Sequence, residues 1–299
     1  MRRGSFFKLQ PLLAVLVVAV LIPSGPSVLA AQGPTMAALR QVGASEVRGV
    51  YVRVPQTSIA GQPLQAMVAL HGMNGNGRDF GAALASEADA HGWLLVAPSI
   101  TYGDWTDPEQ IAREEPALVA WLYDYISHLS DRTGSPVQPR VLFFGHSRGA
   151  QLALRFAEIH PEVVAGVAAV SAGTYTLPVS TDRTGHALDY PFGIANLAQT
   201  DGGQPFNGAR FDSVPIWIGV GGADTIESDV PDAWDPYIGA DRLVRAENFT
   251  QAVQALGANA SLTVFPDADH TLTDDMRASG CSALAQDLTA DTQPSPSAT

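Results

Sequence analysis

Residues 141–156 read VLFFGHSRGAQLALRF, and this stretch decides the fold. The four apolar residues 141–144 predict a buried strand, and apolar residues recur at helical spacing from Leu152 to Ile159. Between the two lies Gly145-His146-Ser147-Arg148-Gly149, a Gly-x-Ser-x-Gly pentapeptide at a strand-to-helix corner. Such a corner lifts the serine hydroxyl above the end of a sheet. The stretch therefore predicts an α/β fold in which Ser147 is a nucleophile.

The surroundings of this corner predict two backbone donors for a negatively charged oxygen. The helix after Ser147 directs its positive end at the serine, and the N–H of Arg148 follows directly. A second donor is expected from the loop after an early strand. Residues 71–77, His-Gly-Met-Asn-Gly-Asn-Gly, follow the apolar stretch 66–70, and Met73 is the natural donor there. The alternative is that 71–77 is an ordinary turn rich in Asn and Gly.

Apolar strands alternate with amphipathic helices over residues 46–286. Strands are predicted at 47–54, 66–70, 93–97, 141–144, 163–170, 214–220 and 261–265. Helices are predicted at 79–91, from Asp107-Pro108 onward, after the Ser147 corner and around 239–256. Pro116 predicts a kink or a break near the start of the second of these. The alternation indicates a mostly parallel sheet with helices on both faces.

An irregular insertion near 172–212 interrupts the alternation. It carries many Gly and Pro residues and no long periodic segment, but it holds five aromatic residues, Tyr175, Tyr190, Phe192, Phe206 and Phe211. Ordered insertions of this length are usually functional. The aromatic content predicts a packed cap over a pocket, and the alternative is a loop that covers the edge of the sheet.

A nucleophilic serine needs a base, and the base needs an acid that orients it. His270 follows the strand at 261–265, at the end of the sheet where ligands gather in open α/β folds. Asp224 follows the strand at 214–220 through Gly221-Gly222-Ala223, so it is the predicted acid. The same loop offers three other acids as alternatives, namely Asp229, Asp232 and Asp235.

The two ends of the chain are expected to lie outside the folded domain. Residues 1–30 combine basic residues, an apolar run from Leu12 to Ile22 and a cleavage site of small residues, which is typical of an export signal peptide. The run is too short to span a bilayer. We therefore expect a secreted or periplasmic protein without a membrane span after signal cleavage. Residues 31–45 are predicted to be mobile, and 287–299, rich in Thr, Ser, Pro and Ala, to be disordered.

The composition limits the partners. The formal net charge is −13, which argues against nucleic acid or an anionic membrane and favours a neutral or weakly charged substrate. Cys281 is the single cysteine, so no disulfide can form within the chain. It is predicted to be a small apolar side chain and not a catalytic thiol.

Taken together, these motifs resemble those of the α/β-hydrolase superfamily. The corner at 145–149, the His71–Gly77 loop, Gly221-Gly222-Ala223-Asp224 and Asp269-His270 stand in the family's order. The resemblance covers most of residues 45–285. Within the superfamily it is similar to secreted esterases of the polyhydroxybutyrate-depolymerase, feruloyl-esterase and dienelactone-hydrolase kind. Many secreted esterases carry disulfides, and the single cysteine is a departure from them.

The resemblance implies a carboxylic-ester hydrolase that uses Ser147, His270 and Asp224 as a catalytic triad. The N–H groups of Met73 and Arg148 would form the oxyanion hole, no cofactor or metal is expected, and the substrate would be a small or polymer-borne ester. Two alternatives stay open. The same residues can serve an amidase, a peptidase or an acyltransferase, and the fold can also serve a protein that binds a ligand without catalysis.

Overall fold

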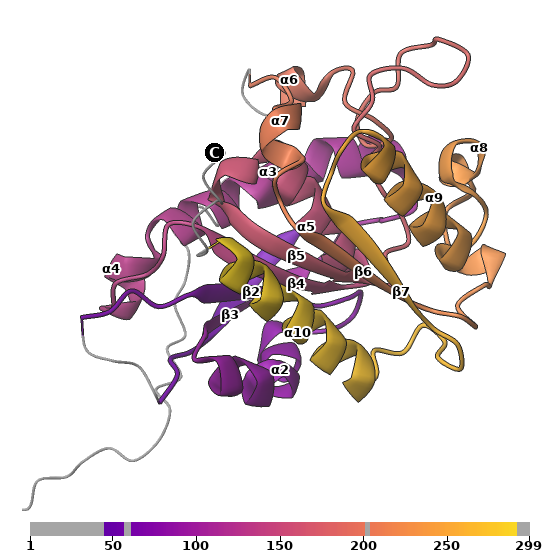
Figure 1. Cartoon of the computed structure of the whole chain (residues 1–299). Helices are drawn as coiled ribbons and strands as arrows, with labels where there is room; N and C mark the ends of the chain where they lie inside the picture. Colours follow the sequence, from indigo (N-terminus) through magenta and orange to yellow (C-terminus); the bar gives the residue numbers. More distant parts are fainter. Residues whose placement is uncertain (1–44, 57–60, 201–203, 292–299) are drawn as a thin grey trace, which may run out of the picture.

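The computed structural model describes residues 45–56, 61–200 and 204–291 (Figure 1). The predicted signal peptide, residues 31–44 and residues 292–299 lie outside the described residues. Within the described ranges, no helix combines the length and hydropathy that crossing a bilayer requires.

The described strands form one seven-stranded sheet in the order β1-β3-β2-β4-β5-β6-β7. All neighbouring strands are parallel except β1 and β3, which pair antiparallel. The sheet is therefore mostly parallel, as predicted. Its strands are β1 Glu46–Arg53, β2 Ala66–Leu70, β3 Leu94–Thr101, β4 Val141–His146, β5 Val164–Val170, β6 Ile216–Gly221 and β7 Ala260–Phe265.

Helices cover both faces of this sheet (Figure 1). The pair α2 and α10 lies against one face, and α3, α5 and α9 lie on the other. The α-helices are α2 Gly77–His91, α3 Pro108–Ser127, α4 Leu129–Thr133, α5 Arg148–Ile159, α6 Leu197–Thr200, α7 Gly208–Phe211, α8 Asp235–Ile238, α9 Arg242–Ala255 and α10 Asp274–Asp291. Three short 3₁₀ turns are η1 Pro161–Val163, η2 Glu227–Asp229 and η3 Asp232–Trp234.

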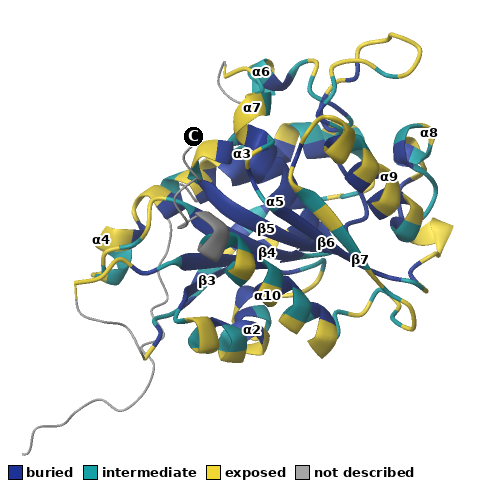
Figure 2. Cartoon of the chain, in the orientation of Figure 1, coloured by how far each residue is buried: buried dark blue, intermediate teal, exposed yellow. Residues whose placement is uncertain are grey.

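Successive residues of the central strands supply two separate hydrophobic cores, because side chains alternate between the faces of a sheet. On β4, Phe143 packs against Phe156 of α5, with ring centroids 4.8 Å apart. The next residue, Phe144, lies on the other face and packs near Phe80 of α2. Figure 2 shows these strands as the most deeply buried part of the molecule. A continuous apolar run is what a strand covered on both faces requires.

Two boundaries differ from those predicted. Ser45 belongs to the folded domain, because its side chain is buried and its hydroxyl donates to Glu114. Residues 287–291 are helical and not a disordered tail, since α10 continues to Asp291. The segment holds helix formers and Leu288, which packs against the core formed with α2. Of the two alternatives predicted at Pro116, the break is absent, because α3 runs through this residue as one helix.

The insertion at 172–212 is packed in part: its first residues are the most buried, whereas most of residues 180–187 are exposed. Residues 171–176 are all buried, and the ring of Tyr175 stacks on Phe249 of α9 at 4.6 Å. Tyr190 and Phe211 are also buried. Part of the insertion, between Leu177 and Leu188, borders a cavity of about 720 Å³ with residues of α8 and α9. The insertion thus covers a pocket, but that pocket does not include Ser147.

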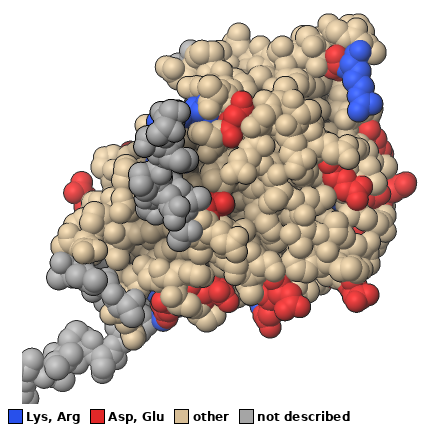
Figure 3. All heavy atoms as spheres, in the orientation of Figure 1, with Lys and Arg blue, Asp and Glu red and all other residues tan. Residues whose placement is uncertain are grey.

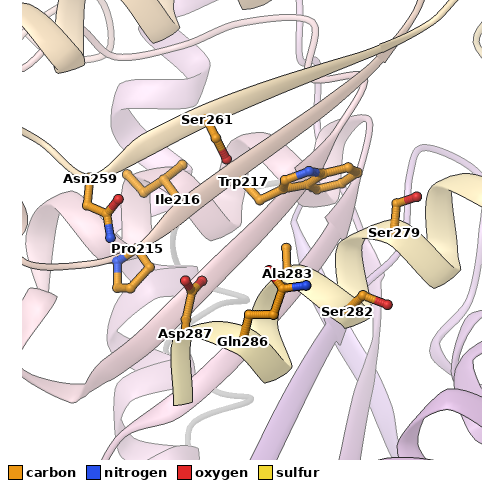
Figure 4. A pocket seen from close by; sticks show the side chains of 10 residues that line it. All are labelled: Pro215, Ile216, Trp217, Asn259, Ser261, Ser279, Ser282, Ala283, Gln286 and Asp287. Carbon is orange, nitrogen blue, oxygen red and sulfur yellow. The ribbon is translucent and has the colours of Figure 1, made fainter. Parts of the chain in front are cut away.

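A further cavity, of about 360 Å³, lies between the sheet and α10 (Figure 4). Its lining includes Pro215 and Asn259, which directly precede β6 and β7, and Asp287 near the end of α10. This cavity therefore lies at the amino ends of the strands. In a parallel sheet that end is opposite to the end at which ligands gather.

Acidic side chains outnumber basic ones on the surface. Asp and Glu are spread over the face shown in Figure 3, with few Lys or Arg among them. This distribution fits the formal net charge of −13. The field around such a surface repels polyanions.

Helix α5 carries an ionisable side chain in an apolar position. Glu158 is 1% exposed, and neither of its carboxylate oxygens has a hydrogen-bond partner within the described part of the chain. Burial raises the pKa of Glu158 well above its usual value, and Arg155 only partly opposes this. The unfolded chain loses this proton at an ordinary carboxyl pKa, whereas the folded protein keeps it. Stability is therefore lost as the pH rises above the unfolded value.

We expect Glu158→Gln to raise the melting temperature at pH 8 by several degrees and to change it little at pH 4.5. The reason is that glutamine does not titrate, and each kcal/mol of stability corresponds to about 2–4 °C for a domain of this size. Thermal unfolding of both proteins at the two pH values measures the difference. An equal shift at both pH values would contradict the assignment of a buried, protonated carboxyl.

Candidate active site

Ser147 lies at the corner between β4 and α5 in a backbone conformation that few residues adopt. Its φ is 54° and its ψ is −119°. A non-glycine residue in such a region costs about 1–3 kcal/mol and persists only where its surroundings enforce it. Here the Ser147 N–H donates to the carbonyl of Val170 at the end of β5, at 2.8 Å. The hydroxyl therefore stands above the carboxyl ends of the central strands.

The two glycines of the motif are required by backbone contacts. A Cβ atom at Gly149 would lie 2.0 Å from the carbonyl oxygen of Leu70, at the end of β2. One at Gly145 would lie 2.5 Å from the carbonyl oxygen of Gly149. The absence of a side chain at Gly149 lets α5 begin directly against β2. The absence of one at Gly145 lets the end of β4 lie close to the first turn of α5. The corner therefore excludes side chains at positions 145 and 149.

The side chains of Ser147, His270 and Asp224 form a continuous hydrogen-bonded series. His270 Nε2 is 2.9 Å from Ser147 Oγ, and His270 Nδ1 is 2.9 Å from Asp224 Oδ2. The residues come from the loops after β4, β6 and β7, which end at the same edge of the sheet. Gly221 allows the last two loops to meet, because a Cβ there would lie 2.3 Å from the carbonyl oxygen of Ala268.

The contacts of the Asp224 carboxylate keep it ionised. It is 3% exposed, and its second oxygen accepts from Arg242 at 3.1 Å. Burial opposes ionisation, but the hydrogen bond from His270 and the charge of Arg242 outweigh it and lower the pKa of Asp224. An ionised carboxylate only accepts hydrogen bonds, so Nδ1 of His270 carries a proton. Nε2 is then the acceptor for the Ser147 hydroxyl, which is the tautomer that a general base requires.

The three alternative acids lie elsewhere in the loop after β6. Asp232 is exposed, and the Asp235 carboxylate pairs with Arg245 at 2.6 Å. Asp229 contributes its backbone carbonyl to Arg242, at 2.6 Å. Among the described hydrogen bonds of His270, the carboxylate partner is Asp224 and none of these three.

The predicted donors Met73 and Arg148 lie beside Ser147. Met73 borders the same cavity as the Ser147 side chain, and Arg148 is the first residue of α5. Neither N–H takes part in a hydrogen bond within the described ranges. A Cβ at Gly72 would lie 3.1 Å from Ser147 Cβ, which shows how closely the loop after β2 approaches the serine. Both N–H groups thus belong to backbone segments next to Ser147 and have no hydrogen-bond partner among the described residues.

His71 fixes the loop that carries Met73. The backbone N–H of Ile100 donates to His71 Nε2 at 2.9 Å, so Nδ1 carries the ring proton and donates to the Gly72 carbonyl at 2.7 Å. Burial lowers the pKa of His71, which keeps this neutral tautomer. Tyr102 adds a hydrogen bond from its hydroxyl to the His71 carbonyl, at 3.0 Å. The sequence marked His71 as part of the loop but gave no sign of Tyr102.

His146 supports the loop that carries His270. Its Nε2 donates to the His270 carbonyl at 3.0 Å, and the two rings lie 5.2 Å apart. Burial, together with the nearby His270, lowers the pKa of His146 to about 4. The ring is therefore neutral at physiological pH, and it acts as a spacer between the corner and the loop after β7.

A cavity of about 560 Å³ opens next to Ser147. Its floor combines the apolar side chains of Met73, Phe80, Ala83 and Leu272, and Arg277 of α10 borders it as well. It lies between α2, α10 and the loops after β2 and β7, and no residue of the insertion that the structure describes lines it. Within the described residues, no three His, Cys, Asp or Glu side chains are arranged to hold a metal ion.

Comparison with known proteins agrees with this architecture. Residues 65–213 match a sequence model described as the alpha/beta hydrolase fold. The sheet order and the corner at Ser147 define a protein of that fold class. The chain belongs to the α/β-hydrolase superfamily, as the resemblance implied. No curated protein matches it in sequence.

Several solved structures share the fold. One is poly(aspartic acid) hydrolase-1 from Sphingomonas sp. KT-1, at 22% identity and a TM-score of 0.58, covering 88% of this chain and 98% of that one. Another is LpqC, a poly(3-hydroxybutyrate) depolymerase from Bordetella parapertussis, at 23% identity and a TM-score of 0.58. The match covers 83% of this chain and 87% of that one. A third is an S-formylglutathione hydrolase from Agrobacterium tumefaciens, at 18% identity and a TM-score of 0.51. The match covers 89% of this chain and 93% of that one. At such identities the likeness concerns the fold.

We expect Gly149→Ala to destabilise the protein by about 3 kcal/mol or more, because the new methyl group would collide with the end of β2. Gly49→Ala is the matched control, since a Cβ there meets no atom within 4 Å. Its expected effect is within about 0.5 kcal/mol. Chemical unfolding of both variants measures this, and equal stabilities would contradict the contact between α5 and β2.

Stability should also fall as the pH drops from about 6.5 to about 4. The unfolded chain takes up a proton on His146 at the ordinary histidine pKa, while the folded protein takes it up only near 4. The contribution is up to about 3 kcal/mol and is complete above pH 6.5. Urea unfolding at several pH values in this range gives the free energy of unfolding as a function of pH. The slope of this free energy against pH should be smaller for His146→Gln than for the wild type. Identical slopes would show that His146 does not titrate in this way.

Proposed function

We propose that the protein is a serine hydrolase that cleaves carboxylic esters through an acyl-enzyme intermediate. The observation that carries this proposal is the unbroken hydrogen-bonded series from Ser147 Oγ through His270 to Asp224, with 2.9 Å at each step. Geometry of this kind activates a serine hydroxyl in unrelated folds. Its position at the carboxyl ends of the strands, beside an open cavity, supports the same function.

In the proposed reaction, Ser147 Oγ attacks the ester carbonyl carbon while its proton passes to His270 Nε2. The carbonyl oxygen becomes an oxyanion, which accepts hydrogen bonds from the N–H groups of Met73 and Arg148. His270 then gives its proton to the leaving alcohol as the carbon–oxygen bond breaks. Water attacks the acyl-enzyme with His270 again as the base, and the acid product leaves Ser147 free. Asp224 stabilises the imidazolium in both halves.

An ester is the favoured substrate class for two reasons. Solved structures of similar fold include an esterase, a poly(3-hydroxybutyrate) depolymerase and an S-formylglutathione hydrolase, whose names denote ester or thioester cleavage, whereas poly(aspartic acid) hydrolase-1 is named for a polyamide. The cavity beside Ser147 has an apolar floor that suits a neutral acyl or alcohol group. With a net charge of −13 and the predicted export signal, the proposed setting is outside the cytoplasm, on a small or polymer-borne ester and without nucleic acid or cofactor.

Ser147→Ala should lower kcat for a p-nitrophenyl ester by at least about 10³-fold, because no other group in the series can form the acyl-enzyme. Steady-state kinetics on esters of graded chain length measures the loss. The same assay with amide substrates and alcohol acceptors separates ester hydrolysis from amidase and acyltransferase activity.

Ser171→Ala is the matched control for this experiment. Ser171 is a buried serine with a φ of 51° directly after β5, so it shares the unusual backbone of Ser147 but has no bond to His270. Its replacement should leave kcat within about twofold. Equal losses in the two variants, or full activity in Ser147→Ala, would overturn the proposal.

A further inference from the structure

A buried ionic cluster lies behind the Ser147 corner, and the proposed reaction does not use it. Glu115 of α3 accepts from Arg148 at 2.6 Å through one oxygen and from Arg155 at 2.8 Å through the other. All three side chains are at most 4% exposed. These bonds connect α3 to the first residue of α5 and to Arg155, further along the same helix.

The cluster is charged despite its burial. Burial alone would raise the pKa of Glu115, but Arg148 and Arg155 outweigh that effect and hold it below the usual value. Apolar side chains of similar size often stabilise a core as well as such a cluster does. Packing alone therefore does not explain three buried charges at this place. A role in positioning the backbone would explain them.

Arg148 connects this cluster to the corner. Its backbone N–H directly follows Ser147, and its guanidinium is held by Glu115, by Gln151 at 3.3 Å and by the ring of Tyr102 at 5.4 Å. A side chain anchored at three points restricts the backbone that carries it. The orientation of the Arg148 N–H is thereby coupled to the position of Glu115.

Tyr102 extends the connection to the other proposed donor. While its ring faces Arg148, its hydroxyl donates to the carbonyl of His71 at 3.0 Å. The His71 ring is itself locked by Ile100 and Gly72, so this hydrogen bond reaches a rigid part of the loop that leads to Met73. Glu115, Arg148, Tyr102 and His71 thus form one continuous chain of contacts between the two donors.

We propose that Glu115, the Arg148 side chain and Tyr102 are positioning residues that hold the N–H groups of Arg148 and Met73 at the separation an oxyanion requires. This inference rests on the proposed function. The three side chains touch no reacting atom, and they act through the two backbone segments that they connect. Their loss should weaken the binding of the oxyanion and leave the binding of the uncharged ester unchanged.

The remaining contacts of the cluster provide an internal control. Tyr190 donates its hydroxyl to the second oxygen of Glu115 at 3.0 Å, on the side of Arg155. Arg155 in turn donates to Thr174 and Thr176 of the insertion. Tyr190 is as deeply buried as Tyr102, and it reaches neither Arg148 nor the loop after β2 through a hydrogen bond. These contacts fasten the insertion to α5.

The test compares Tyr102→Phe with Tyr190→Phe, since each change removes one buried phenol hydroxyl. For an ester substrate we expect Tyr102→Phe to lower kcat about 10- to 100-fold with KM within about twofold. The affinity for a trifluoromethyl ketone, which forms an oxyanion on Ser147, should fall by the same factor. Tyr190→Phe should reduce the melting temperature to a similar extent while kcat and ketone affinity stay within about twofold.

Arg148→Lys interrupts the same chain at a second point. Lysine keeps the charge beside Glu115 but lacks the planar guanidinium that lies over the ring of Tyr102. It should reproduce the selective loss of kcat and ketone affinity. Two results would overturn this inference alone, provided that the wild type is active. One is a Tyr102→Phe variant with unchanged kcat and ketone affinity, and the other is an equal loss of kcat in the two tyrosine variants. A wild type that neither hydrolyses esters nor binds the ketone would overturn the proposed function as well.

Discussion

The close approach of α5 to the end of β2 is the constraint on which the site depends. With no side chain at Gly149, the first turn of the helix lies against the carbonyl of Leu70, and Ser147 is held in a left-handed conformation between them. The strain of about 1–3 kcal/mol is small beside the burial of β4 and α5 in two cores. The fold can therefore maintain a backbone geometry that a short peptide would not adopt.

The parallel order of the strands turns this one corner into a site. Because β4, β6 and β7 all end at the same edge of the sheet, the loops after them bring Ser147, Asp224 and His270 together from positions up to 123 residues apart. The glycines at 221 and 72 remove the atoms that would keep these loops separate. The neutral rings of His71, which is buried, and His146, which is half-buried, then hold the loops in place through hydrogen bonds to backbone groups.

The sequence allowed the fold and the placement of the main site residues to be predicted, because both depend on local signals. An apolar strand, a glycine-flanked serine and polar residues directly after later strands are visible without a structure. The cluster of Glu115, Arg148 and Tyr102 was not predictable, since Glu115 lies mid-helix and its partners are chosen by packing. The lining of the Ser147 cavity was also missed: the aromatic insertion covers another cavity, and α2 and α10 form this one. The extension of α10 places half-buried Leu288 against the core formed with α2, a contact that its polar neighbours in the sequence do not indicate.

The central claim is that the contacts of His270 and Asp224 make one hydroxyl in this protein a nucleophile. Reaction of the purified protein with a fluorophosphonate, followed by peptide mass mapping, tests this most directly. The account predicts one phosphonyl group per chain, attached to Ser147 within the peptide that contains residues 145–149, and much slower labelling when His270 is replaced by glutamine. An unmodified Ser147, or a phosphonyl group on a different residue, would contradict it.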